Sequence, residues 1–256
     1  MNVGTSPLFD QCYETLTEQG SLKTWSLIVT IFGDLAPDGI AALDSQLLGA
    51  LCATFSVRPE ALRVALHRLR KDGWLETEKS GRRSVYRLSN MGQELTREVY
   101  RRIYRSPVIK PSDWHIMIAS EDAPEHPDSV PINSNLSVSA IDHAAFGFKS
   151  PAAEVPAWLK ARLKDEEAAS DFKRFECAIR DLPEQAEKLS SAQRLCLRLL
   201  VLHYWRRLLL RRPDAQERLM GPEWEGFGAR VAARKVFDVF SRPDSAELST
   251  SFIEAA

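Results

Sequence analysis

The sequence predicts a mainly α-helical protein with a small β content, of the α+β class. The chain of 256 residues is longer than the ~150 residues of one ordinary domain, so two or three modules are expected. Its composition, 44% hydrophobic and 27% charged, is that of an ordinary folded protein. Apolar residues recur at helical spacing in several segments, whereas the alternation typical of strands is confined to short ones.

The first two helices are predicted in the amino-terminal quarter, after a tail of residues 1–20. The first begins at Lys23 and ends between Gly33 and Pro37. Its apolar residues at helical spacing are Leu27, Ile28, Ile31, Phe32 and Leu35. The second has Asp44 or Ser45 as its cap. Its apolar stripe is formed by Leu47, Leu48, Leu51 and Phe55.

A third helix follows the short segment SVRPE, with Ser56 as its expected cap and Pro59 in its first turn. Its buried face is predicted from residues spaced at i, i+3, i+4 and i+7, namely Leu62, Ala65, Leu66 and Leu69. At ~100° per residue, the opposite face and its flanks carry Glu60, Arg63, Val64, His67, Arg68, Arg70 and Lys71. Gly73 closes the helix as a left-handed cap.

A β-hairpin is predicted next, with the strands WLETE and SVYRLS joined by the glycine turn KSGRR. The turn is basic because it carries Lys79, Arg82 and Arg83. Three helices followed by a basic hairpin is the order of a winged helix-turn-helix domain, whose third helix enters the major groove of DNA. The sequence therefore predicts a DNA-binding domain over residues 21–104.

The distribution of charge agrees with this prediction. Residues 58–110 hold 14 Lys and Arg against 6 Asp and Glu, a net charge of +8, although the whole chain carries −1. A local basic block favours a local polyanion site. Arg63 and His67, in the front half of the third helix, are predicted to read base edges. The predicted phosphate contacts are Arg58, Lys71, Lys79, Arg82 and Arg83. For Arg68 and Arg70, a salt bridge inside the domain is an equal alternative to a DNA contact.

Two separated segments resemble the PaaX-type transcriptional repressors, named for phenylacetic acid catabolism. One is RVALHRLRKDGWLETEKSGRRSVYRLSNMG, preceded by WSLIVTIFGD, and the other is LHYWRRLLLRRPDAQERLMGPEWEGFGAR. The resemblance implies a repressor of a catabolic operon with acyl-coenzyme A ligands such as phenylacetyl-CoA. It also implies a small ferredoxin-like module in the middle of the chain.

The middle segment, residues 105–152, departs from that family pattern. WHIMIAS fits a first strand, and NLSVSAIDHAAFGFKSP contains a later strand and a GF turn. Between them, EDAPEHPDSVPINS has three prolines, no basic residue and no amphipathic helix. The module is therefore expected to be short or rebuilt, which leaves its role in dimerisation or ligand binding open.

Residues 153–256 are predicted to form a C-terminal helical domain, with a long helix through SSAQRLCLRLLVLHYWRRLLLRR. Its buried face includes Leu195, Leu199, Leu202 and Leu209. Arginines at its end either complement the helix dipole or bind the phosphates of an effector. The aromatic residues nearby, including Trp205, either wall an acyl pocket or are plain core. The predicted effector site consists of His203, Tyr204, Arg206, Arg207, Arg211 and Trp224.

Other classes of protein are disfavoured. Phosphate-binding, dinucleotide-binding, hydrolase and zinc-protease motifs are missing, so neither an enzyme nor a cofactor is expected. Four scattered cysteines without a CxxC pair argue against a disulfide framework or a zinc site and favour a cytoplasmic location. No stretch of twenty apolar residues occurs, so no membrane span is expected.

The function predicted from the sequence is that of a homodimeric repressor that binds double-stranded operator DNA and is released by an acyl- or aryl-CoA. Two subunits are expected because one recognition helix reads only a short half-site. The alternative is a winged-helix module that binds an acidic protein surface without sequence-specific DNA binding. A relic of a small-molecule-binding enzyme is a weaker third possibility.

Overall fold

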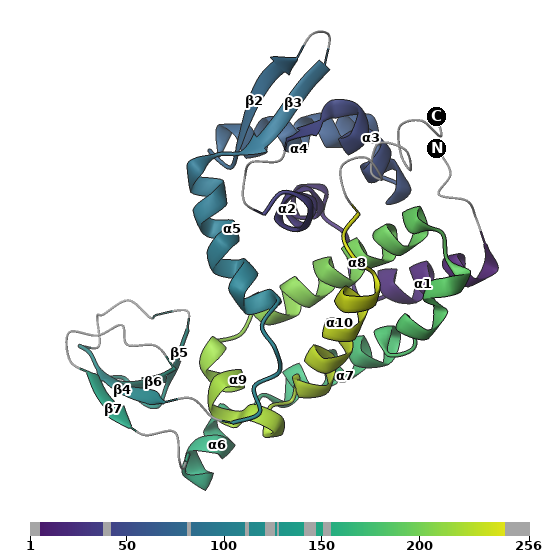
Figure 1. Cartoon of the computed structure of the whole chain (residues 1–256). Coiled ribbons are helices and arrows are strands. Elements are labelled where there is room, and N and C mark those ends of the chain that lie inside the picture. Colours follow the sequence, from purple (N-terminus) through teal and green to yellow (C-terminus); the bar gives the residue numbers. More distant parts are fainter. Residues whose placement is uncertain are drawn as a thin grey trace. The chain divides into compact units, whose positions relative to one another are not determined.

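A computed structural model shows a mainly helical chain with two small antiparallel sheets (Figure 1), as the sequence predicts. The chain forms two compact units. Unit 1 contains residues up to Tyr104, Ala178–Tyr204 and the residues from Lys235 on, and unit 2 contains Arg105–Cys177 and Trp205–Arg234. The structure describes residues 6–37, 42–80, 83–110, 113–120, 126, 128–140, 147–150 and 155–243.

Unit 1 begins with three helices, α1 (Pro7–Thr17), α2 (Thr24–Leu35) and α3 (Ser45–Thr54). The segment Pro7–Thr17 was expected to belong to a tail. It is helical because Ser6 accepts a hydrogen bond from the Phe9 amide at 3.1 Å, and because Phe9 and Leu16 are buried. The predicted cap of α3 is confirmed, since Oδ1 of Asp44 accepts from the amides of Gln46 and Leu47 at 2.7 and 2.8 Å.

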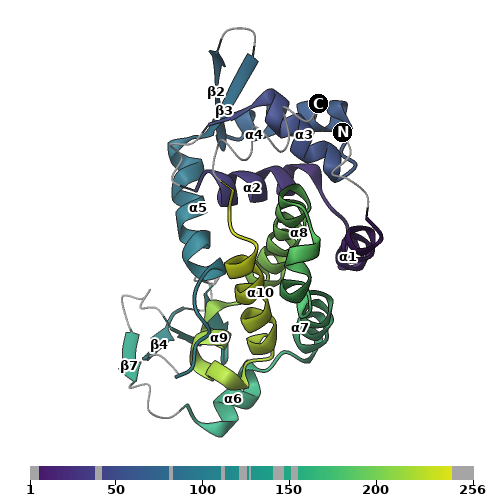
Figure 2. The same ribbon diagram turned by 45° about the vertical axis from the view of Figure 1, so that its right-hand side comes forward.

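Helix α4 (Pro59–Lys71) has the buried face that the sequence predicts, with Leu62, Ala65, Leu66 and Leu69 inside. In Figures 1 and 2, α2 lies beneath α3 and α4, and it packs against α4. The expected cap at Ser56 is wrong: Ser56 adopts a positive φ of 57°, and Arg58 occupies the cap without a side-chain hydrogen bond. Gly73 ends the segment with φ 76°, which confirms the predicted left-handed turn.

The predicted hairpin is present, formed by β2 (Leu75–Ser80) and β3 (Arg83–Leu88). A two-residue strand, β1 (Leu43–Asp44), pairs with the other side of β3, so the strand order is β1-β3-β2. The hairpin projects beyond the helices of unit 1 (Figure 1). Helix α5 (Asn90–Ile103) follows it, capped by Ser89.

Among the described residues, the helices α7 (Glu166–Ile179), α8 (Ser191–Leu210) and α10 (Phe227–Val239) have residues in both units. The 3-10 turn η1 (Pro183–Lys188) precedes α8. The part of α8 in unit 1 is buried over most of its length, including Leu195, Leu199 and Leu202. The sequence predicts this long helix and its buried leucines correctly.

Asp34, at the end of α2, is fully buried and connects three side chains of unit 1. Arg198 of α8 donates from Nε to Oδ2 at 2.7 Å and from Nη2 to Oδ1 at 2.8 Å. Arg242 donates to Oδ1 at 2.8 Å, and the Tyr104 hydroxyl donates to it at 2.6 Å. Burial opposes the charge on Asp34, but the hydrogen bonds and charge of Arg198, with the charge of Arg242, outweigh it and lower its pKa.

Unit 2 contains a four-stranded antiparallel sheet of order β5-β6-β4-β7. The strands are β4 (Trp114–Ile118), β5 (Ser129–Pro131), β6 (Leu136–Ser139) and β7 (Gly147–Ser150). Besides its parts of α7, α8 and α10, the unit contains the helices α6 (Ala157–Leu163) and α9 (Asp214–Met220) and the turn η2 (Gly221–Glu223). No helix lies between β4 and β7 in the residues described there, so a ferredoxin-like arrangement of this segment stays a prediction.

Candidate nucleic-acid interface

The outward face of α4 is exposed along its whole length and is predominantly basic. Glu60, Arg63, Val64, His67, Arg68, Arg70 and Lys71 are all exposed, opposite the buried leucines. Three of the cations, Arg68, Arg70 and Lys71, lie in the last turn, where the helix dipole favours positive charge. The geometry therefore keeps a row of polar side chains on one side of the helix.

Two of these arginines form ion pairs with their own helix segment. Arg63 lies 3.8 Å from Glu60 and Arg68 lies 3.5 Å from Asp72, measured between nitrogen and oxygen. Both arginine side chains are at least 70% exposed, so each pair contributes little to stability and leaves the guanidinium accessible. The intramolecular salt bridge considered for Arg68 is present. It is weak enough to exchange for a phosphate contact.

A second group of side chains forms no hydrogen bond or ion pair within the described part of the chain. It consists of Arg58, His67, Arg70, Lys71 and Lys79. Four of them, Arg58, Arg70, Lys71 and Lys79, are cations, and such a local concentration of positive charge attracts a polyanion. Arg70, which the sequence left undecided, therefore belongs with the accessible cations.

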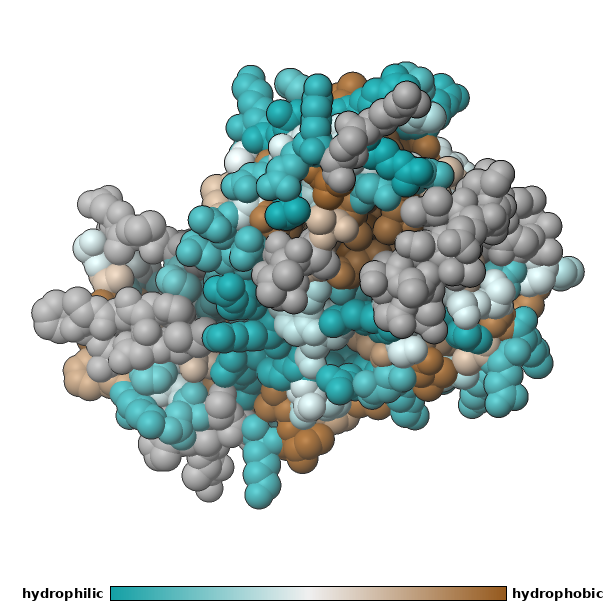
Figure 3. Space-filling view, turned by 45° about the horizontal axis from the view of Figure 1, so that its top comes forward, coloured by the Kyte–Doolittle hydropathy of each residue, from teal (hydrophilic) through white to brown (hydrophobic). Residues whose placement is uncertain are grey.

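The hairpin adds further basic side chains. Lys79 and Arg83 are exposed, and Nη1 of Arg83 lies 3.7 Å from Oδ2 of Asp44, whose other oxygen caps α3. Figure 3 shows hydrophilic side chains over much of its upper part, with hydrophobic ones among them. Arg82 lies outside the described residues.

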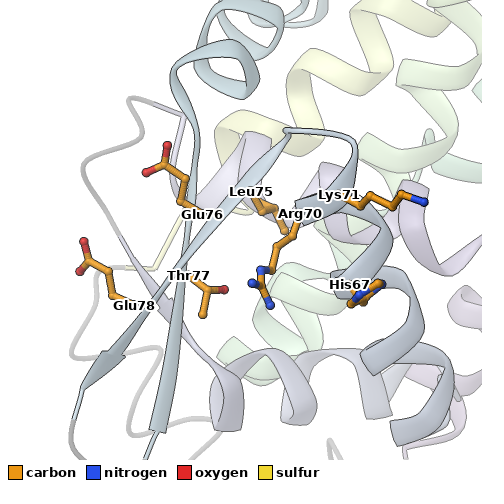
Figure 4. A pocket seen from close by; sticks show the side chains of 7 residues that line it. All are labelled: His67, Arg70, Lys71, Leu75, Glu76, Thr77 and Glu78. Atoms are coloured by element: carbon orange, nitrogen blue, oxygen red, sulfur yellow. The ribbon is translucent and has the colours of Figure 1, made fainter.

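A cleft of about 530 Å³ lies between α4 and β2. It is lined by His67, Arg70, Lys71, Leu75, Glu76, Thr77 and Glu78. Figure 4 shows the Arg70 guanidinium between the helix and the strand, whereas Glu76 and Glu78 point to the other side of the strand. Sequence reasoning did not find this cleft, because it is built by two elements whose separation no spacing pattern reveals.

The predicted effector residues are divided between the two units. In unit 1, His203 is fully buried with Nδ1 3.4 Å from the Thr30 hydroxyl, and the Tyr204 hydroxyl donates to the Gly20 carbonyl at 2.8 Å. In unit 2, Trp224 is buried, with its ring centre 4.9 Å from that of Phe172. These rings are packed in the core, and their role in binding an effector stays a prediction.

The arginines near the end of α8 lie in different environments. Burial and the neighbouring charge of Arg207 lower the pKa of Arg206 to about 10. Arg211 is exposed, whereas Arg212 contacts Asp165 and Asp171 at 3.4 Å each. Arg206 and Arg207 are thus two adjacent cations, and the charge of Arg207 disfavours the charged form of Arg206.

Other kinds of site are not visible in the described parts of the chain. No group of three or more His, Cys, Asp or Glu side chains there is placed to hold a metal ion. No helix among the same residues is long and apolar enough to cross a membrane.

Comparisons with known proteins agree with this description. The model of a family described as PaaX-like protein matches residues 23–92, and that of the PaaX-like protein C-terminal domain matches residues 163–250. The transcriptional repressor PaaX of Escherichia coli (strain K12) is 28% identical over 249 residues, covering 83% of this chain and 78% of that protein. The uncharacterized protein Rv0674 from Mycobacterium tuberculosis resembles this chain in structure, with a TM-score of 0.54 and 18% sequence identity. The match covers 90% of this chain and 99% of the other. That structural likeness concerns the fold alone.

Proposed function

The chain belongs to the PaaX-like family, and from this premise we propose that it is a DNA-binding transcriptional repressor. The similarity to a transcriptional repressor of Escherichia coli supports this proposal. In this proposal the chain is a regulator without enzymatic activity that acts in the cytoplasm on a catabolic operon.

The amino-terminal part of unit 1 has the element order of a winged helix-turn-helix domain. In this interpretation, α3 and α4 form the helix-turn-helix, α4 is the recognition helix and the β2–β3 hairpin is the wing. The pairing of β1 with β3 supports it, because it fixes the wing to the segment that precedes α3. Residues 21–104 form the proposed domain.

The observation that carries the proposal is the set of accessible cations on α4 and β2. Arg63 and His67 contact base edges in the major groove. Phosphates are bound by Arg58, Arg68, Lys71, Lys79, Arg82 and Arg83. Arg70 is a further phosphate contact in this proposal, because its guanidinium lies in the cleft between α4 and β2.

A gel-shift titration tests the proposal. The purified protein is titrated with the DNA upstream of its own gene and with a random duplex of equal length, at several salt concentrations. We expect the upstream DNA to bind at least a thousandfold more tightly, with affinity falling steeply as salt rises because phosphate contacts release counterions. Equal, salt-independent binding to both duplexes would falsify the proposal.

The repressor acts as a homodimer in this proposal. One recognition helix contacts a short half-site, so two copies related by a two-fold axis are needed to specify an operator. The C-terminal helices, with a contribution from the middle segment, supply the dimer contacts. Sedimentation at micromolar concentration tests this, and a monomer both free and on DNA contradicts it.

The effector is an acyl- or aryl-CoA that releases the protein from DNA. The support is the paired charge of Arg206 and Arg207 in unit 2, because guanidinium groups are strong ligands for phosphate. Arg211 adds a third cation, and Trp224, in the same unit, is proposed to contact the acyl group.

A further inference from the structure

Val64 is the most exposed large hydrophobic side chain in the described parts of the chain, at 69%. It lies in the middle of α4, on the face opposite Leu62, Leu66 and Leu69. Valine is also a poorer helix former than alanine, because its branched side chain loses freedom in a helix. Neither packing nor helix propensity explains a valine at this position.

The surroundings of Val64 are polar. Its neighbours one helical turn away are Glu60 and Ala61 on one side and His67 and Arg68 on the other, all of them exposed. The ion pair between Arg63 and Glu60 lies beside it. Val64 and Ala61 together form a small apolar spot within a basic surface.

The ligand of such a spot must offer one small apolar group surrounded by negative charge. The major groove of DNA has this chemistry, since the C5-methyl group of thymine is its apolar feature and the phosphates border it. An acidic protein surface would satisfy the cations, but it would not require an apolar group at the centre of the contact. The cations beside Val64, Arg63 and Arg68, therefore favour DNA.

We propose that Val64 contacts the C5-methyl group of a thymine, so that each operator half-site carries a thymine opposite the middle of α4. This inference rests on the proposed function, because it requires α4 to enter the major groove. Val64 then determines sequence specificity at that base, between the base edges contacted by Arg63 and His67.

Uracil substitution tests the contact, because deoxyuridine differs from thymidine only by the missing methyl group. Each thymine of the operator is replaced singly, and binding is measured for the wild-type protein and for Val64→Ala. We expect one position in each half-site where the replacement weakens wild-type binding about fourfold, the value of one buried methyl group. The same replacement leaves the affinity of Val64→Ala unchanged, since the contact is already lost.

Val239→Ala is the matched control, since Val239 is an exposed valine at the end of α10, with 46% of its surface accessible. Its affinity and its uracil profile should equal those of the wild type. Val64→Ala should also melt at or slightly above the wild-type temperature, because alanine is the better helix former. A lower DNA affinity of Val64→Ala would therefore not be the result of unfolding.

The remaining outcomes separate the two proposals. If the wild type prefers its operator but no uracil effect disappears in Val64→Ala, the thymine contact is refuted and the DNA-binding function stands. If Val64→Ala weakens binding while every uracil effect persists, Val64 acts without the methyl group and the inference is again refuted. If the wild type does not distinguish the operator from random duplex, both proposals fail.

Discussion

At the scale of single residues, Asp34 has the most consequential environment in unit 1. Its carboxylate is buried, and it is the shared partner of Arg198, Arg242 and Tyr104. Removing one member of a buried ion network leaves the other charges without compensation, which costs ~3–5 kcal/mol. We expect Asp34→Asn to lose that much unfolding free energy in urea titrations at pH 7, whereas Asp72→Asn, in an exposed pair, changes it by less than ~0.5 kcal/mol.

The lowered pKa of Asp34 also predicts a pH dependence. A carboxyl group whose pKa is lowered by folding stabilises the protein fully above its unfolded pKa of about 3.9. That stabilisation is lost as the pH falls through the lower folded value. The difference in unfolding free energy between the wild type and Asp34→Asn should therefore be constant at neutral pH and shrink below about pH 4. A difference that grew on acidification would contradict the assignment.

Arg70 gives a residue-scale test of the cleft between α4 and β2. If it binds a backbone phosphate, Arg70→Ala reduces the slope of log K against log salt by about 0.9, for operator and random DNA alike. Arg87→Ala is the control, because it removes the same charge from an arginine that does not line the cleft and that pairs with Glu78 at 3.0 Å. Equal slopes for Arg70→Ala and the wild type would show that Arg70 contacts no DNA phosphate.

At the scale of elements, Asp44 connects α3 to the hairpin. One oxygen caps α3 and the other faces Arg83. Asp44→Ala should destabilise the protein by ~1 kcal/mol, because the first amides of α3 lose their acceptor. Asp44→Ser should recover most of that stability in thermal unfolding, since serine also caps helices. If both variants were equally unstable, the pair with Arg83 would matter more than the cap.

The recognition helix and the wing should differ in what they contribute to binding. Arg83→Ala in the wing is expected to weaken binding to all sequences alike, whereas Arg63→Ala costs ~1–3 kcal/mol only at the preferred base. A binding assay over a library of single-base operator variants separates the two effects. A change of sequence preference in Arg83→Ala, with none in Arg63→Ala, would reverse these roles.

The elements themselves were largely predictable because each carries a local signal. The spacing of Leu62, Leu66 and Leu69 indicates one buried face of α4, and Gly73 marks its end. Serine is a preferred cap residue, which favours Ser56, but the helix begins at Pro59 and its cap is Arg58, while Ser56 has a positive φ. The segment of α1 does carry helical spacing, with Leu8, Phe9, Cys12, Tyr13 and Leu16 at i, i+1, i+4, i+5 and i+8, so this helix was predictable as well.

At the scale of the whole molecule, local sequence patterns do not predict which distant residues come into contact. Asp34 and Arg198 are separated by 164 residues, and no spacing rule links the GD sequence of α2 to an arginine inside α8. Periodicity predicted that α8 buries its leucines, but not that its residues divide between two units. The candidate DNA-binding face was predictable because it lies on one helix and the adjoining hairpin.

The effector hypothesis makes a prediction about the whole molecule, because it couples unit 2 to DNA binding. A ligand releases DNA only if it binds the DNA-free state more tightly, and by linkage DNA must weaken ligand binding by the same factor. Titrating the protein–operator complex with a panel of CoA thioesters should release the DNA. Operator DNA should lower the affinity of the protein for that thioester by the same factor by which the thioester lowers the affinity for operator DNA.

Arg207→Ala should need more thioester for release while binding the operator as tightly as the wild type, because it removes a phosphate ligand outside the recognition domain. Arg174→Ala is the control, since Arg174 is an exposed arginine on α7 that pairs with Asp171 at 2.8 Å. If no thioester dissociates the complex, or if Arg207→Ala and Arg174→Ala release identically to the wild type, Arg206 and Arg207 serve only to complement the carboxyl end of α8.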